Sequence, residues 1–213
     1  AHLGRPDGKE DKSLSLKPIS ERRSPVVSTK FLFSDEILGS KTKEIISSMD
    51  FGEAVLLENL RFDKREKEND KTFSKELSNL ADLYVNDAFG ASHREHSSII
   101  GVLDFIPSCF GFAFQKEIKV LEKVLNSPKR PLIVILGGKK KGKLNQIKGL
   151  KFLADKLLIG GKLSLLSDDS FSKDQKILVA SLTQNSRDID TESIEKFKKE
   201  IEKAQIIIMA GTM

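Results

Sequence analysis

Short apolar runs recur along this chain and alternate with amphipathic helical patterns. The runs lack the strict alternation of half-exposed strands, which is typical of strands buried on both faces. They lie at residues 55–57, 83–85, 132–136, 157–159, 177–180 and 206–209. Apolar residues spaced by three or four positions predict helices at 70–80, 114–125, 147–153 and 191–204. The alternation predicts an α/β fold with mainly parallel sheets.

A break in this pattern divides the chain near residues 126–131, NSPKRP, where two prolines and a basic pair follow a long amphipathic helix. We therefore predict two Rossmann-like, three-layer units joined by an interdomain helix. The units cover residues 1–111 and 128–213, and the helix covers 112–127. The chain begins without methionine and stops directly after an apolar run, so we expect a piece of a longer protein or a trimmed one.

Composition sets limits on the class of protein. The 213 residues are 38% hydrophobic and 31% charged, as in soluble globular proteins. No apolar run approaches the roughly 20 residues of a membrane span. The single cysteine, Cys109, cannot form an internal disulfide, which fits a cytoplasmic protein. The net charge of +5 allows acidic small molecules or nucleic acid as partners.

Histidine and arginine gather in three segments that open the chain or follow predicted strands. Ligands of open α/β folds bind beyond the carboxyl ends of the strands, and arginine and histidine donate hydrogen bonds to carboxylate and phosphate. The segments are AHLGRPDG with His2 and Arg5, ENLRF with Arg61, and NDAFGASHREHSS with His93, Arg94 and His96. A single arginine such as Arg65 or Arg187 is more often solvated. The co-location makes an anion pocket as plausible as a solvated surface.

The stretch VILGGKKKGK, residues 134–143, places lysines after two glycines at the end of a predicted buried strand. It nearly fits a phosphate-binding P-loop, but Leu144 stands where that loop needs Ser or Thr for magnesium. A nucleic-acid patch would have aromatic residues among the cations, and residues 139–151 contain none. A solvated face is the third alternative. The position favours phosphate, because the glycines admit a ligand and we expect the lysines to open the next helix.

Together, four motifs resemble phosphoglycerate kinase: AHLGRPDG, LLENLRF, YVNDAFGASHREHSS and LGGKKKGK, in this order. The resemblance extends from residue 1 to about 161 and again over 188–213. It implies a two-domain, cytoplasmic, monomeric enzyme of glycolysis that transfers a phosphoryl group between 1,3-bisphosphoglycerate and ADP. The products are 3-phosphoglycerate and ATP, Mg²⁺ arrives with the nucleotide, and neither a membrane nor a nucleic acid is a partner. The helix at 112–126 would be a hinge element for domain closure.

The resemblance also implies roles for individual residues. The matching substrate-binding residues are His2, Leu3, Gly4, Arg5, Arg61 and Arg94. The matching nucleotide-binding residues are Gly137, Gly138, Lys140, Lys143, Gly160 and Gly161. Lys140 would be catalytic, because phosphoryl transfer depends on positioning and on neutralising the charge of the transferred group. No residue of this chain is expected to ligate a metal.

Some family features are missing or changed. The family's opening strand would lie upstream of Ala1, and its last, glycine-rich segment beyond Met213. Lys162 replaces the third glycine of a triplet, the stretch between Gly161 and Asp188 is short, and the Trp-Asn-Gly-Pro-Met turn becomes MAGTM at 209–213. We therefore expect phosphoglycerate binding to be retained better than phosphoryl transfer. Two alternatives stay open: a non-catalytic relative that binds phosphoglycerate or another small anion, and a basic module that binds nucleic acid.

Overall fold

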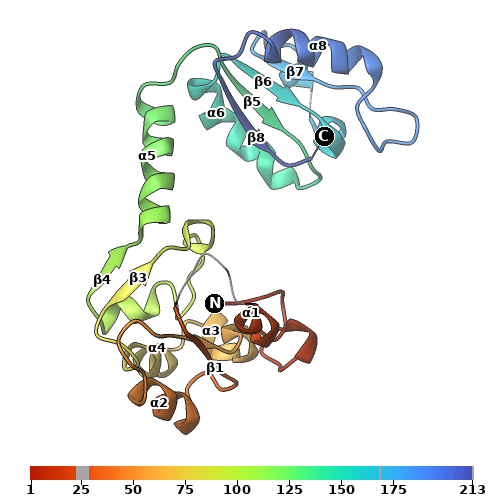
Figure 1. Cartoon of the computed structure of the whole chain (residues 1–213). Coiled ribbons are helices and arrows are strands. Elements are labelled where there is room, and N and C mark those ends of the chain that lie inside the picture. Colours follow the sequence, from red (N-terminus) through yellow and green to blue (C-terminus); the bar gives the residue numbers. More distant parts are fainter. Residues whose placement is uncertain (23–28, 168, 213) are drawn as a thin grey trace. The chain divides into compact units, whose positions relative to one another are not determined.

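The structure is a computed structural model that describes residues 1–22, 29–167 and 169–212. The chain forms two compact units, Ala1–Glu117 and Ile118–Met213 (Figure 1). All pairs between the named strands of the described residues are parallel. The predicted α/β class with parallel sheets is therefore confirmed.

Unit 1 contains two separate pairs of strands. Strand β1 (Phe31–Ser34) pairs with β2 (Ala54–Leu57), and β3 (Tyr84–Asn86) pairs with β4 (Ser108–Phe110). Strands β2 and β3 match the predicted runs, whereas β1 and β4 were not predicted. The residues of β4 are all exposed, so this strand carries no pattern of burial that its sequence could reveal. The two pairs do not join into one sheet within the described residues, which differs from the single three-layer unit that we predicted.

Short helices connect these strands. The α-helices are α1 (Lys17–Glu21), α2 (Ser40–Ser47), α3 (Lys64–Lys67) and α4 (Lys71–Ser78), and the 3-10 helices are η1 (Lys12–Leu14), η2 (Leu60–Phe62), η3 (Phe89–Ala91) and η4 (Gly101–Asp104). Helix α4 begins where Asp70 accepts a hydrogen bond from the backbone N–H of Phe73 at 2.8 Å, the usual arrangement of an N-cap. The Phe73 side chain is fully buried. This helix lies within the predicted range 70–80.

Helix α5 (Phe112–Asn126) contains the boundary between the two units and matches the predicted helix. Its first turn belongs to the core of unit 1. The Phe114 ring is buried, stacks on Phe110 with 4.3 Å between the ring centroids, and meets the edge of Phe89 at 5.2 Å. The Phe114 backbone N–H donates to the Asp87 carboxylate at 2.8 Å. Aromatic packing and this hydrogen bond therefore fix where the helix begins.

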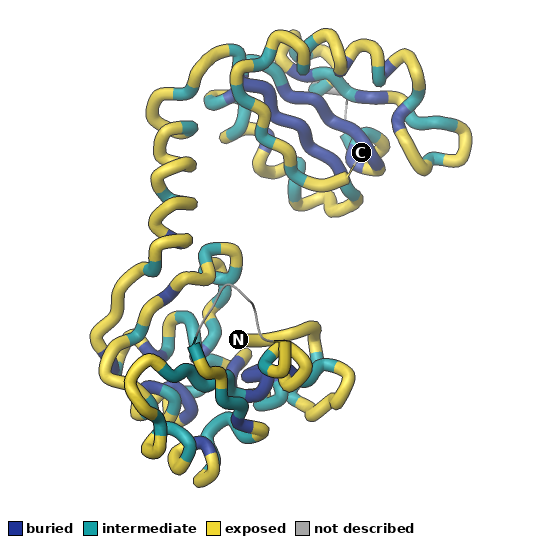
Figure 2. Tube along the Cα trace, in the orientation of Figure 1, coloured by how far each residue is buried: buried dark blue, intermediate teal, exposed yellow. Residues whose placement is uncertain are grey.

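Unit 2 is built on one parallel sheet with strand order β7-β6-β5-β8. The strands are β5 (Leu132–Leu136), β6 (Lys156–Ile159), β7 (Ile177–Val179) and β8 (Ile206–Ala210), and the helices are η5 (Lys141–Gln146), α6 (Ile147–Leu153), η6 (Gly161–Leu166), α7 (Asp169–Ser172) and α8 (Thr191–Ile201). All four strands were predicted from their apolar runs. Figure 2 shows the buried centre of this sheet in dark blue.

The two faces of this sheet belong to different apolar clusters. Successive side chains of a strand point to opposite faces, so Val134 of β5 packs with Ile147 of α6, whereas Ile135 packs with Phe197 of α8. Helices thus cover both faces, which explains why β5 is apolar at every position. Strand β8 lies at the edge of the sheet, and Ile207 and Met209 are about half exposed. Our prediction that every run is buried on both faces is therefore wrong for β8, and also for the run at 83–85, where Leu83 and Val85 are about half exposed.

Candidate functional site

Strand β2 leads directly into the turn that carries Arg61. Asn59 begins η2, where its side-chain oxygen accepts a hydrogen bond from the Arg61 backbone N–H at 3.1 Å. Arg61 is only 7% exposed. Its Nη1 donates to the Gly4 carbonyl oxygen at 2.9 Å, while its Nε has no hydrogen-bond partner among the described residues. The buried guanidinium is therefore attached to the first loop of the chain, residues 1–16.

That first loop contains four of the predicted substrate-binding residues. Gly4 has φ of +63°, and a Cβ at this position would lie 2.7 Å from the Leu14 side chain, so the turn requires glycine. The Leu3 carbonyl oxygen accepts a hydrogen bond from the Asn59 side-chain amide at 2.8 Å. His2 and Arg5 flank these two residues and are exposed. The backbone of this loop is thus attached to Arg61 at Gly4, between His2 and Arg5.

Arg94 acts on His2 through its charge. The pKa of His2 is lowered, first because the surrounding protein desolvates the ring and then because of positive charge on Arg94, on the chain terminus and on His96. The pKa of His96 is lowered in the same way, with Arg94 as its largest charged cause after desolvation. The cations of the first loop and of the loop after β3 therefore lie close enough to repel one another. A bound anion would relieve that repulsion.

The structure thus relates the predicted substrate-binding residues to one another in two ways. Direct hydrogen bonds connect the loop around Gly4 with Arg61, and electrostatic repulsion connects His2 with Arg94. Arg5 follows Gly4 and is exposed. The buried neighbours Glu58 and Asn59 were missed in the sequence. The available signal was their position, since two polar residues directly follow a predicted buried strand. Polar groups that are buried need hydrogen-bond partners, so such residues are candidates for structural contacts.

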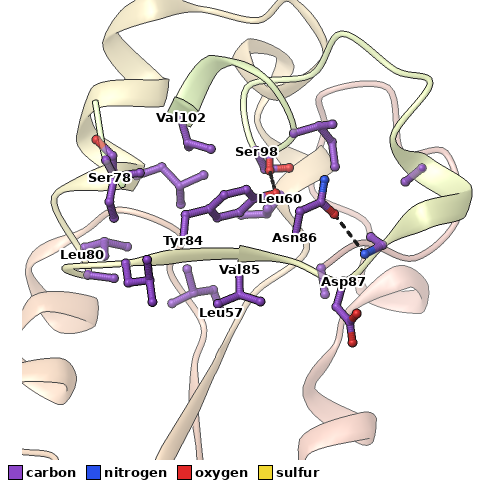
Figure 3. Close-up of a pocket in the computed structure, with 18 of the residues that line it drawn as sticks. Leu57, Leu60, Ser78, Leu80, Tyr84, Val85, Asn86, Asp87, Ser98 and Val102 are labelled. Atoms are coloured by element: carbon purple, nitrogen blue, oxygen red, sulfur yellow. Dashed lines mark hydrogen bonds between the residues drawn. The ribbon is translucent and has the colours of Figure 1, made fainter. Parts of the chain in front are cut away.

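Two cavities in the described part of unit 1 are not built for an anion. The first, of about 360 Å³, lies beside His2 and is lined mainly by apolar residues such as Leu57, Val85 and Val102 (Figure 3). The Tyr84 hydroxyl in its wall already donates to the Ser98 carbonyl oxygen at 2.8 Å. The second, of about 660 Å³, is lined by many carboxylates: Glu10, Asp35, Glu36, Glu58, Asp63 and Glu76. His2 lines the first cavity, whereas Arg5, Arg61 and Arg94 line neither.

The glycines predicted to bind nucleotide lie where the strands of unit 2 end. Gly137 follows β5 and donates to the Ala210 carbonyl oxygen of β8 at 3.0 Å, and Gly160 follows β6 and donates to the Leu136 carbonyl oxygen at 2.9 Å. Gly138 and Gly161 have φ of +102° and +57°, which favours glycine at both positions. These four residues therefore share the carboxyl edge of the sheet, where α/β folds bind their ligands.

The lysines near this edge differ in what they contact. The Lys143 ammonium donates to the carbonyl oxygens of Gly137 and Ala210, both at 3.0 Å, and so joins the ends of β5 and β8. Lys139, Lys140 and Lys141 are exposed. Lys143 therefore has a structural contact that the sequence did not indicate.

Our expectation that the lysines open an α-helix is wrong. Residues Lys141–Gln146 form the 3-10 helix η5, and α6 begins only at Ile147. The lysines therefore do not lie at the N-terminus of an α-helix, where free backbone N–H groups would face an anion. The side-chain charges of the lysines, and the glycine backbone, remain as groups suited to phosphate.

Two further observations concern metals and membranes. Within the described ranges there is no cluster of three or more His, Cys, Asp or Glu side chains placed to hold a metal ion. No helix in the same part of the chain is long and apolar enough to cross a bilayer. Met213, the last residue of the predicted MAGTM turn, lies outside the described residues.

Sequence comparisons match this chain to the same family that its motifs resemble. A family model described as phosphoglycerate kinase matches residues 1–181. The phosphoglycerate kinase of Finegoldia magna is 43% identical over 209 residues, which cover 96% of this chain and 50% of the relative. The enzyme of Clostridium tetani is 41% identical over 205 residues, which cover 93% of this chain and 50% of the relative. The chain thus spans about half the length of the curated relatives that it matches.

Solved structures give the same result. The phosphoglycerate kinase of Coxiella burnetii matches with a TM-score of 0.63 at 28% identity, over 97% of this chain and 51% of that structure. That of Pyrococcus horikoshii matches with a TM-score of 0.77 over 100% of this chain and 67% of the other, and its 23% identity indicates likeness of fold alone. The family model covers most of the sequence, and the motifs of both units lie within it. This chain therefore belongs to the phosphoglycerate kinase family.

Proposed function

We propose that this chain serves phosphoryl transfer between 1,3-bisphosphoglycerate and ADP, giving 3-phosphoglycerate and ATP in glycolysis. Residues 1–111 would bind phosphoglycerate, 128–213 would bind the nucleotide, and 112–127 would be the interdomain helix. The observation that carries the proposal is the contact between the Arg61 guanidinium and the Gly4 carbonyl oxygen. This contact joins two separate motifs of the family in one small, cationic region of unit 1.

The chemistry of unit 1 suits an anion that carries both a carboxylate and a phosphate. His2, Arg5 and Arg94 present cationic or neutral donors, and Arg61 keeps a buried donor beside them. We assign these side chains to the phosphoglycerate, with the backbone of Leu3 and Gly4 completing the loop. Each charge-assisted hydrogen bond contributes about 1.5–3 kcal/mol, so a few of them suffice for binding at micromolar to millimolar strength.

Unit 2 supplies the groups for nucleotide phosphates. Gly137, Gly138, Gly160 and Gly161 would let the phosphates and adenine approach the backbone, and Lys140 would neutralise charge on the transferred group. The donors at this edge are N–H and ammonium groups, whereas Mg²⁺ prefers oxygen ligands. We therefore propose that Mg²⁺ arrives with ATP or ADP. The ion would neutralise charge on the phosphates during the transfer.

We further propose a cytoplasmic monomer that binds phosphoglycerate better than it transfers phosphate. The reason lies in unit 2: the Lys143 ammonium is already held by two carbonyl oxygens, and Lys162 stands in place of a glycine. The same observation supports the second candidate function, a non-catalytic relative that binds phosphoglycerate. Nucleic acid is the least favoured partner, because the lysines of residues 139–143 have no aromatic residues among them.

A calorimetric titration with 3-phosphoglycerate and a coupled ATP–phosphoglycerate assay test these proposals together. Arg94→Ala should abolish binding, and Arg22→Ala, a change at an exposed arginine of the same unit, should not. Binding without turnover would identify the non-catalytic relative. Turnover of roughly 1–100 per second, typical of kinases, would show that unit 2 is competent. A folded chain that binds no 3-phosphoglycerate would contradict the proposed function.

A further inference from the structure

Glu58 is a buried carboxylate that holds the far end of the first loop. It is 8% exposed. One of its oxygens accepts from the Ser15 hydroxyl at 2.6 Å, and the other accepts from the backbone N–H groups of Leu16 at 2.8 Å and of Asn59 at 2.7 Å. Three neutral donors thus satisfy both oxygens of the buried side chain. The carboxylate fixes the position where the loop ends.

Asn59 ties two points of the same loop together. Its side chain is fully buried, and its amide nitrogen donates to the carbonyl oxygens of Leu3 at 2.8 Å and of Leu14 at 3.0 Å. An amide nitrogen carries two donors, and both are used here. Leu3 and Leu14 lie on either side of the turn that contains Arg5. The amide therefore sets the distance between the two arms of the loop.

Backbone hydrogen bonds complete this attachment. The Leu60 N–H donates to the Ala1 carbonyl oxygen at 3.2 Å, and the Arg61 carbonyl oxygen accepts from the Gly8 N–H at 3.1 Å. Within residues 1–16 the only regular element is the short helix η1. A loop with so little structure of its own takes its position from the residues that hold it. Residues 58–61 are those residues here.

We propose that Glu58 and Asn59 are positioning residues of the phosphoglycerate site. Both residues act through the loop. Their polar side-chain atoms are already hydrogen-bonded to atoms of the loop and to the backbone of residues 59–61. Their task is to hold His2 and Arg5 at a fixed distance from the buried Arg61. This inference rests on the proposed function for its ligand. Its structural part, the fixing of the loop, stands apart from any ligand.

Hydrogen exchange in the free full-length chain tests the structural part. Asn59→Asp replaces the amide nitrogen, and with it both donors, by one oxygen that faces the carbonyl oxygens of Leu3 and Leu14. The amides of residues 3–16 should therefore exchange at least about tenfold faster, while those of α4 keep their rates. Asn79→Asp, at an exposed position after α4, is the matched control and should leave the loop unchanged. Unchanged loop exchange in Asn59→Asp would overturn the proposal.

A second pair of variants distinguishes loss of positioning from misfolding of the chain. Glu58→Ala removes all three acceptor contacts, whereas Glu58→Gln keeps an acceptor for the two backbone N–H groups and offers a donor to the Ser15 hydroxyl. Affinity for 3-phosphoglycerate should fall about tenfold or more in Glu58→Ala, and Glu58→Gln should restore it to within about threefold of wild type. Equal losses in both variants, with the fold retained, would overturn the positioning role.

A double-mutant cycle separates positioning from general stability. If Asn59 works by placing Arg5, then Arg5→Ala should cost much less affinity in the Asn59→Asp background than in wild type. Additive losses would mean that Asn59 does not act through Arg5 and would overturn the inference. A wild-type chain that binds no 3-phosphoglycerate would refute the proposed function instead, and the exchange measurement would then decide on the loop by itself.

Discussion

The guanidinium of Arg61 donates to the carbonyl oxygen of Gly4 at 2.9 Å, so a residue of the 3-10 helix η2, which follows strand β2, holds the turn that opens the chain. Gly4 is in the left-handed region and directly precedes Arg5. Through this contact the buried Arg61 is attached to the backbone beside the exposed Arg5, although the two residues lie far apart in the sequence. The contact makes the cationic region of unit 1 a defined structure rather than a set of independent surface charges.

Replacing Arg61 with lysine should weaken binding of 3-phosphoglycerate roughly tenfold or more. Lysine keeps the positive charge, but its single ammonium cannot reproduce the planar fork that contacts Gly4 and still offers a further donor. The loss of one charge-assisted hydrogen bond, about 1.5–3 kcal/mol, sets this magnitude. Calorimetric titration measures it, with Arg22→Lys as the control at an exposed site. Wild-type affinity in Arg61→Lys would mean that the buried donor does not face the ligand.

Binding of 3-phosphoglycerate should depend on the protonation of His2. Desolvation and the charge of Arg94 hold the pKa of His2 below its ordinary value of 6.5, and a neighbouring anion would raise that pKa. Binding should therefore take up a proton. Affinity should rise as the pH falls through the pKa that His2 has in the complex. It should level off below the lower pKa that His2 has in the free chain.

Calorimetry in buffers of different ionisation enthalpy, between about pH 5 and 8, measures this proton uptake. The ligand phosphate also titrates near pH 6, and His2→Asn retains that part of the pH dependence while removing the contribution of the ring. Identical proton uptake in wild type and in His2→Asn would show that His2 does not contact the anion.

Lys143 and Lys140 should respond differently to the same substitution. Lys143→Met leaves the carbonyl oxygens of Gly137 and Ala210 without their shared donor, and we expect unit 2 to lose about 1–2 kcal/mol of stability. Lys140 is exposed, so Lys140→Met should leave stability unchanged and reduce ADP affinity. Hydrogen exchange of the β5 and β8 amides reports the stability, and titration with ADP reports the binding. Equal stability of the two variants would contradict the role assigned to Lys143.

Glu66 should make unit 1 less stable as the pH rises. It is 3% exposed, and burial raises its pKa above the ordinary 4.5, although hydrogen bonds from Ser98 oppose the shift. The folded state therefore binds a proton more tightly than the unfolded chain. The stability that this provides is complete below about pH 4.5 and is lost as the pH rises through the folded pKa.

Comparison of wild type with Glu66→Gln between pH 4 and 7 tests this dependence. The variant should gain stability relative to wild type across that window, as measured by denaturant unfolding followed at the amides of unit 1. Glu66 has two titratable neighbours: His96, whose Nδ1 lies 3.6 Å from the carboxylate, and the Ala1 amino group. Both should be monitored by their own titrations. A constant difference between the two proteins at every pH would contradict the raised pKa. Glu68→Gln, at an exposed position, is the control.

Periodicity predicted the elements that are buried and regular. The run at 132–136 coincides with β5, and the spaced apolar residues at 191–204 contain α8. Strand β4 was missed because its residues are all exposed, and the lysines before α6 form the 3-10 helix η5, a helix type that their pattern did not indicate. These errors share a cause. Where a segment has no apolar face, its sequence pattern predicts neither its burial nor its helix type.

The motifs indicated which loops carry the site but not how the site is supported. Arg61, His2 and Arg94 were recognised from residue type and position, whereas Glu58 and Asn59 looked like ordinary polar residues after a strand. Their importance comes from burial and from partners such as Leu3 and Leu14. Those partners lie far away in the sequence, and no local rule connects them.

The sequence by itself determined the four strands of unit 2, its helices α6 and α8, and the family, because strand and helix periodicities and long motifs are properties of neighbouring residues. Only the tertiary structure decided that Arg61 holds Gly4 and that Lys143 joins β5 to β8. These hydrogen bonds form between segments that folding brings together. Their geometry depends on how the strands pack, and packing is a property of the whole unit.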